Sequence, residues 1–78
     1  MMEPEMIQSI LLKQLPGAEV TVLDMTGTRD HFEVTVLWDG FKGKGLIQQH
    51  QMINKALEMQ LEDGSIHALK IKTYAPKT

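Results

Sequence analysis

The chain has 78 residues, a formal net charge of -2 and no cysteine. This length predicts one domain with a single small core, and the lack of cysteine excludes disulfides, thiol catalysis and thiolate metal sites. Hydrophobic residues make up 42% and charged residues 23% of the chain, as in ordinary globular domains. No apolar run approaches the roughly 18 residues that cross a membrane, and no secretory signal is recognisable, so we expect the cytoplasm as compartment.

The first half of the chain changes from a helical pattern to a strand pattern. Pro4 suits the first turn of a helix, and Pro16 and Gly17 end it. Between them, apolar residues follow at helical spacing: Ile7, Ile10, Leu11 and Leu15. From Ala18 the apolar period becomes two, which predicts a half-buried strand through residue 22. After a loop at residues 25–30, alternating apolar residues from 32 to 38 predict a second strand, paired with the first as a hairpin, with Trp38 in the core.

The second half predicts a turn region, a helix and a last strand. Residues 39–45 contain three glycines and allow only a short helical turn. Apolar or histidine residues then recur at steps of three or four, which predicts one helix of about four turns: Leu46, His50, Ile53, Leu57 and Leu61. Asp63 and Gly64 end this helix, and the final strand runs from about residue 66 to 74. The fold class is therefore α+β, with a three-stranded mixed sheet packed on helices in a single domain spanning residues 1–78.

Two of the three histidines lie near the starts of the second and third strands. A helix between these strands predicts a crossover connection and hence a parallel pair. Neighbouring strands lie about 4.8 Å apart, so His31 and His67 could share a ligand at one edge, beside the loop at residues 25–30. Strict alternation, however, places the two imidazoles on opposite faces of the sheet. The alternatives are a solvated His31 and a partly buried His67 that bonds a backbone carbonyl.

Other motifs give weaker indications. His50 lies on the apolar stripe of the long helix, where a packed residue at the edge of the core is the usual role. No metal-ligand spacing such as HxxxH occurs, so two histidines leave an incomplete ligand shell for a partner or a small thiol to complete. No nucleophile has a base at useful spacing, which predicts that the chain is not an enzyme.

A Gly-x-x-Gly segment precedes the long helix. In KH domains such a loop clamps the backbone of a nucleic acid, and the residues that would do so here are Gly40, Lys42, Gly43 and Lys44. The alternative is a flexible turn. The acidic net charge disfavours nucleic-acid binding, which usually needs a basic patch.

Several segments together resemble the BolA family: His31 to Val36, Phe41 to Lys44, Gln48 to Gln51, and the stretch from Ile66 to Pro76 that begins Ile-His-Ala-Leu. The resemblance covers nearly the whole chain from about Ile7. It implies an α-β-β-α-α-β fold related to type II KH domains.

The resemblance also implies a partner, a monothiol glutaredoxin of the CGFS type, and a shared two-iron two-sulfur cluster. The glutaredoxin and glutathione would supply sulfur, His67 would be one ligand, and a Cys or His near the loop between the first two strands would be the other. The loop at residues 25–30 has neither, Thr28 stands about where other members have cysteine, and His31 is the only candidate. The isolated chain is expected to be a monomer without the cluster.

We further expect the glutaredoxin to contact residues beside this edge: Thr28, Arg29, Asp30, Phe41, Lys42, Lys44, Gln49 and His50. Some family members are described as transcriptional regulators, so DNA binding is the alternative. A stress-linked scaffold without a cofactor is the third possibility.

Overall fold

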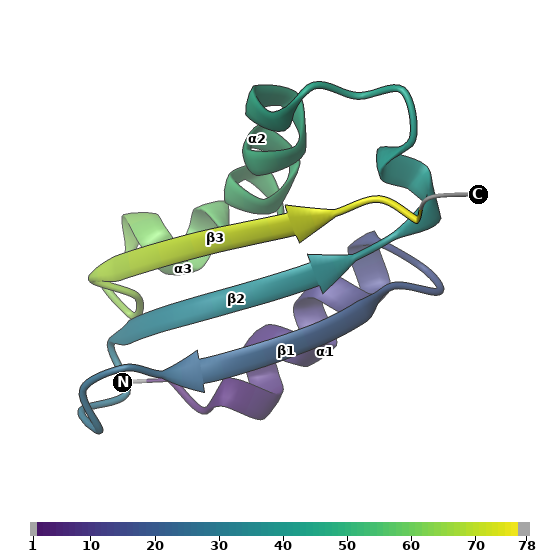
Figure 1. The fold of residues 1–78 in the computed structure, drawn as a ribbon. Coiled ribbons are helices and arrows are strands. Elements are labelled where there is room, and N and C mark those ends of the chain that lie inside the picture. Colours follow the sequence, from purple (N-terminus) through teal and green to yellow (C-terminus); the bar gives the residue numbers. More distant parts are fainter. Residues whose placement is uncertain (1, 77–78) are drawn as a thin grey trace.

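A three-stranded sheet with helices packed on one face makes up the computed structural model, which describes residues 2–76 (Figure 1). The elements follow in the order α1 (Pro4–Gln14), β1 (Glu19–Asp24), β2 (His31–Leu37), the 3-10 turn η1 (Asp39–Phe41), α2 (Leu46–Ala56), α3 (Glu58–Glu62) and β3 (Ala68–Tyr74). The predicted α+β class and mixed sheet are therefore confirmed.

Helix α1 begins and ends where its sequence directs. Pro4 occupies the first turn, where a missing N–H costs no helical hydrogen bond. Glu5 lies near the positive N-terminal end of the helix dipole and Lys13 near the negative C-terminal end. Ile7 and Leu11, one turn apart, are fully buried against the sheet. The helix thus covers the sheet with one apolar stripe.

The strands are arranged in the order β1-β2-β3, with β1 antiparallel and β3 parallel to the central β2. The predicted parallel pair is confirmed. Alternate residues of β2, including Phe32 and Val34, are fully buried beneath the helices. Glu33 lies on the opposite face, where its carboxylate is 3.8 Å from Lys70 Nζ and 3.4 Å from Lys72 Nζ. Alternation in β2 therefore separates the core from a face with charged pairs.

The predicted single helix over residues 46–61 is divided into α2 and α3. Leu57 leaves the helical conformation, with φ -106° and ψ 17°, although its N–H still bonds the carbonyl of Ile53. Leu57 and Ile53 are fully buried, so the apolar stripe continues across the break. Leu46, the first residue of α2, is 62% exposed, contrary to its predicted place on that stripe. Within residues 2–76, neither of these helices nor α1 has the length and apolarity that crossing a bilayer requires.

Trp38 lies one residue beyond β2 and packs over η1 rather than deep in the core. Its indole N–H donates to the carbonyl of Pro16 at 2.8 Å, and its ring meets Phe41 edge-on at a centroid distance of 5.3 Å. A Cβ on Gly40 would lie within 2.6 Å of Cζ2 of this indole. A side chain at position 40 would therefore force the indole of Trp38 to move, and Phe41, which packs against that indole, is fully buried.

Candidate metal-binding rim

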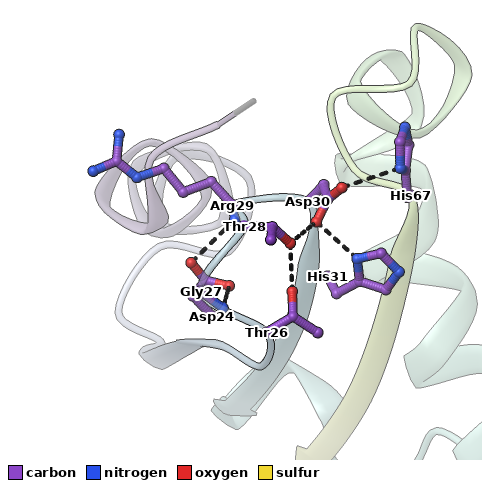
Figure 2. Close-up of polar contacts among 8 residues, drawn as sticks. All are labelled: Asp24, Thr26, Gly27, Thr28, Arg29, Asp30, His31 and His67. Atoms are coloured by element: carbon purple, nitrogen blue, oxygen red, sulfur yellow. Dashed lines mark hydrogen bonds and ion pairs between the residues drawn. The ribbon is translucent and has the colours of Figure 1, made fainter.

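The parallel pairing of β2 and β3 brings two imidazoles to one edge of the sheet. His31, the first residue of β2, pairs with Ala68, the first residue of β3, and His67 directly precedes Ala68. The two histidines therefore lie at the same edge (Figure 2). The ring centroids of His31 and His67 are 6.1 Å apart and the ring planes are nearly perpendicular, at 86°. We call the surface formed by Thr28, Asp30, His31 and His67 the histidine rim.

The prediction that the two imidazoles lie on opposite faces of the sheet is wrong. It assumed that His67 follows the pleat, but β3 begins only at Ala68. The carbonyl of Asp30 accepts the N–H groups of both His67, at 2.7 Å, and Ala68, at 3.2 Å, so the chain turns here before it becomes a strand. The His67 side chain is 61% exposed and does not lean toward the helices. The His31 side chain is 40% exposed, so solvent reaches both rings.

The carboxylate of Asp30 lies between the two imidazoles. Its Oδ1 is 2.7 Å from Nδ1 of His31 and accepts the hydroxyl of Thr28, and its Oδ2 is 3.2 Å from Nδ1 of His67. The Thr28 hydrogen bond, followed by the one with His31, lowers the pKa of Asp30 from 3.8 to about 2. Asp30 is therefore ionised at neutral pH, and its contact with both histidines was not foreseen from the sequence.

The loop that carries Asp30 is fixed by its own hydrogen bonds. The carboxylate of Asp24 accepts the N–H of Gly27 at 3.0 Å and that of Arg29 at 3.1 Å. Arg29 has a left-handed φ of 60°, its guanidinium lies 2.7 Å from Oε1 of Glu3, and its carbonyl accepts the N–H of Met2. Met2 is buried, so the N-terminal segment fastens the loop to the body of the domain.

Two exposed imidazoles beside an ionised carboxylate offer nitrogen donors to a metal. Within residues 2–76, however, there is no group of three or more His, Cys, Asp or Glu side chains arranged to hold a metal ion. A metal at the histidine rim would therefore take part of its ligand shell from another molecule.

The predicted partner contacts divide into two groups. Thr28, Arg29 and Asp30 lie in the loop of the rim. The hydroxyl of Thr73 donates to Gln49 Oε1 at 2.6 Å, and Thr73 is six residues along the sequence from His67, or about 20 Å at 3.3 Å per residue. The amide of Gln49 also donates to the carbonyl of Lys44, so Lys44 lies at the same distant end of β3. The expectation that Lys42, Lys44 and the helix near Gln49 flank the rim is therefore wrong. This second group lies toward the far end of β3 and comprises Phe41, Lys42, Lys44, Gln49 and His50.

Within that group, two residues take on roles in packing. Phe41 is fully buried and presents no side-chain surface to a partner. His50 is half-buried on α2, as its place on the apolar stripe predicts. Gly43, the second glycine of the Gly-x-x-Gly segment, has a φ of +78°, a conformation that favours glycine. Together with the close approach of Trp38 to Gly40, this accounts for both glycines by the fold alone.

Comparison with known proteins places this architecture in a family. The family model described as "BolA-like protein" matches residues 11–78. Protein BOLA2 of Arabidopsis thaliana is 37% identical over 73 residues, covering 92% of this chain and 76% of that protein, and acid stress protein IbaG of Escherichia coli (strain K12) is 35% identical over 75 residues, covering 96% and 86%. The solved structure of BolA1 from Arabidopsis thaliana matches with a TM-score of 0.84 at 27% identity, covering 94% of this chain and 90% of that one. The chain belongs to the BolA family.

Proposed function

We propose that this protein is a non-enzymatic iron–sulfur adaptor that binds a monothiol glutaredoxin and contributes histidine ligands to a shared two-iron two-sulfur cluster. The observation that carries the proposal is the exposed pair His31 and His67 at one edge of the sheet. The cluster would be cargo, held for delivery to an acceptor protein. We expect this adaptor in the cytoplasm.

The donor set of the histidine rim fits such a cluster. Two-iron two-sulfur clusters take four ligands, and a set of two imidazoles and two thiolates occurs in proteins. This chain has no cysteine, so His31 and His67 would supply the nitrogen ligands, and a glutaredoxin thiolate with glutathione would supply the sulfur ligands. A histidine must be in its neutral form to bind iron, and cluster assembly should therefore weaken in acid.

Anaerobic reconstitution tests this proposal. The protein, a monothiol glutaredoxin, glutathione, ferrous iron and sulfide are combined, and the visible absorption and circular dichroism spectra are recorded. We expect a spectrum that differs from that of the glutaredoxin alone, and we expect His67→Ala to abolish the difference. His31→Ala should reduce cluster retention.

The third histidine supplies a matched control. His50→Gln removes an imidazole on α2 that lies away from the rim, so the spectrum of the complex should stay unchanged. If His67→Ala gives the wild-type spectrum while remaining folded, the ligand role and the adaptor function built on it are wrong.

A further inference from the structure

Asp30 contacts both imidazoles of the histidine rim, in each case at the Nδ1 atom of the ring. One carboxylate oxygen lies 2.7 Å from Nδ1 of His31, and the other lies 3.2 Å from Nδ1 of His67 (Figure 2). The two Nε2 atoms are the ring nitrogens that this carboxylate leaves for other contacts. A single side chain thus contacts one ring from the first residue of β2 and one ring from the residue just before β3.

The ionised carboxylate acts on both rings, through a hydrogen bond with Nδ1 of His31 and through an ion-pair contact with Nδ1 of His67. An ionised carboxylate has no proton and can only accept hydrogen bonds. A neutral His31 that bonds it must therefore carry its proton on Nδ1, and the negative charge 3.2 Å from Nδ1 of His67 favours the same tautomer there. In both rings this tautomer leaves the lone pair on Nε2. Neutral histidine in water favours the opposite tautomer, with the proton on Nε2. The arrangement around Asp30 therefore predicts a tautomer that differs from that of a freely solvated histidine.

We propose that Asp30 is a positioning residue that orients both imidazoles and makes Nε2 the ligating atom of each. The proposal rests on the adaptor function, which supplies the metal. A carboxylate that accepts the remote N–H of a ligating histidine is a recurrent outer-shell contact in metalloproteins, where it sets the tautomer and the ring orientation. Here one carboxylate serves two ligands.

The position of Asp30 is itself determined by the fold. Its carbonyl accepts the N–H groups of His67 and Ala68, so its backbone is joined to the start of β3. Its carboxylate accepts the hydroxyl of Thr28, which in turn is bonded to the hydroxyl of Thr26 at 2.5 Å. Because Thr28 donates to the carboxylate, Thr26 must donate to Thr28. Asp30 is thus held at two points, with its carboxylate bonded to the loop and its backbone carbonyl bonded to the start of β3. A positioning residue needs such a fixed place.

Long-range proton–nitrogen NMR of the imidazoles tests the proposal on the chain alone, without metal or partner. At about pH 8.5, where ordinary histidine is neutral, we expect His31 and His67 of the wild type to carry their protons on Nδ1. In Asp30→Ala we expect both to shift toward the tautomer protonated on Nε2. The signals of His50, on α2, should be the same in both proteins and show that the change is local. Wild-type rings protonated on Nε2 would overturn the proposal before any substitution is made.

A second measurement uses the complex with glutaredoxin. Loss of an outer-shell partner typically weakens metal binding by about 10- to 100-fold, and we expect Asp30→Ala to release the cluster to a chelator faster by a factor in that range. Glu62→Ala, which removes an exposed carboxylate of α3, serves as control. If the cluster requires His67 and yet is retained equally by Asp30→Ala and the wild type, the positioning role is overturned and the adaptor function stands. If the cluster does not require His67, the adaptor function fails. The NMR measurement on the chain alone still shows whether Asp30 sets the tautomers of the two rings.

Discussion

Substituting Gly40 with alanine should test whether the Gly-x-x-Gly segment is a structural requirement. A Cβ at position 40 would lie within 2.6 Å of Trp38 Cζ2 and would also overlap the neighbouring atoms Cη2 and Cζ3. The indole must move, since it belongs to a side chain whereas position 40 is fixed in η1 next to buried Phe41. The substitution therefore acts through the contacts that Trp38 loses.

The expected cost follows from those contacts. The hydrogen bond from Trp38 to the carbonyl of Pro16 contributes about 1 kcal/mol, and the edge-on aromatic pair with Phe41 contributes roughly 0.5–1.5 kcal/mol. Their combined loss is about 2 kcal/mol. In a domain of this size, 1 kcal/mol shifts the melting temperature by about 4–8 °C, so Gly40→Ala should melt about 8–16 °C below the wild type.

Tryptophan fluorescence during thermal and urea denaturation measures the effect, because Trp38 is the single tryptophan of the chain. The folded variant should also emit at longer wavelength, since its indole moves into water. Gly45→Ala is the matched control: its Cβ would meet nothing within 4 Å, and the cost should stay within the roughly 1 kcal/mol typical of a helix cap. A Gly40→Ala protein with wild-type melting and emission would refute this reasoning and return the segment to consideration as a nucleic-acid loop.

Substitutions at three further positions test the loop and the charged face of the sheet. Arg29→Gly should be more stable than Arg29→Ala by about 1 kcal/mol in urea denaturation, the reverse of the usual order, because the left-handed φ of 60° strains every residue but glycine; equal stabilities would show that the loop is free to relax. Asp30 has a pKa of about 2 when folded against 3.8 when unfolded, so its stabilising effect is complete above about pH 5 and is lost as the pH falls toward 2. The urea midpoint of the metal-free wild type should therefore fall more steeply over this range than that of Asp30→Asn. If the midpoints of the two proteins fall in parallel with pH, the lowered pKa of Asp30 is contradicted. Glu33→Ala should cost at most about 1 kcal/mol, with a difference from the wild type that shrinks in high salt, since the pairs with Lys70 and Lys72 are close to solvent; an effect independent of salt would indicate a packing role instead.

The topology could be predicted from sequence because it depends on periodic patterns. The alternation of Phe32, Val34 and Val36 indicates a strand with one buried face, and a helix between two strands favours a parallel crossover. These two rules suffice to place His31 and His67 near one edge. The same rules fail for the break at Leu57, because a buried leucine that continues an apolar stripe carries no signal for where the backbone leaves the helix.

The contacts of the histidine rim could not be read from the pattern. Whether His67 points to the core or to water depends on where β3 begins, and this is decided by the carbonyl of Asp30, a residue distant in sequence. One signal was available: Asp24 followed three residues later by Gly27 is typical of a tight polar turn, which would have indicated an ordered loop before Asp30. A crossover helix runs back from the end of β2 toward the start of β3, so its first turn, which carries Gln49, could likewise have been placed far from His67.

The burial of Met2 and its hydrogen bond to the carbonyl of Arg29 have a practical consequence for handling this protein. A fusion tag joined ahead of Met2 would leave the domain beside Asp30 and the two imidazoles, where it would crowd the proposed glutaredoxin partner. A tag joined beyond Pro76 would leave from the opposite end of β3. Under the proposed adaptor function, binding of the glutaredoxin should therefore be weaker with the tag ahead of Met2 than with the tag beyond Pro76.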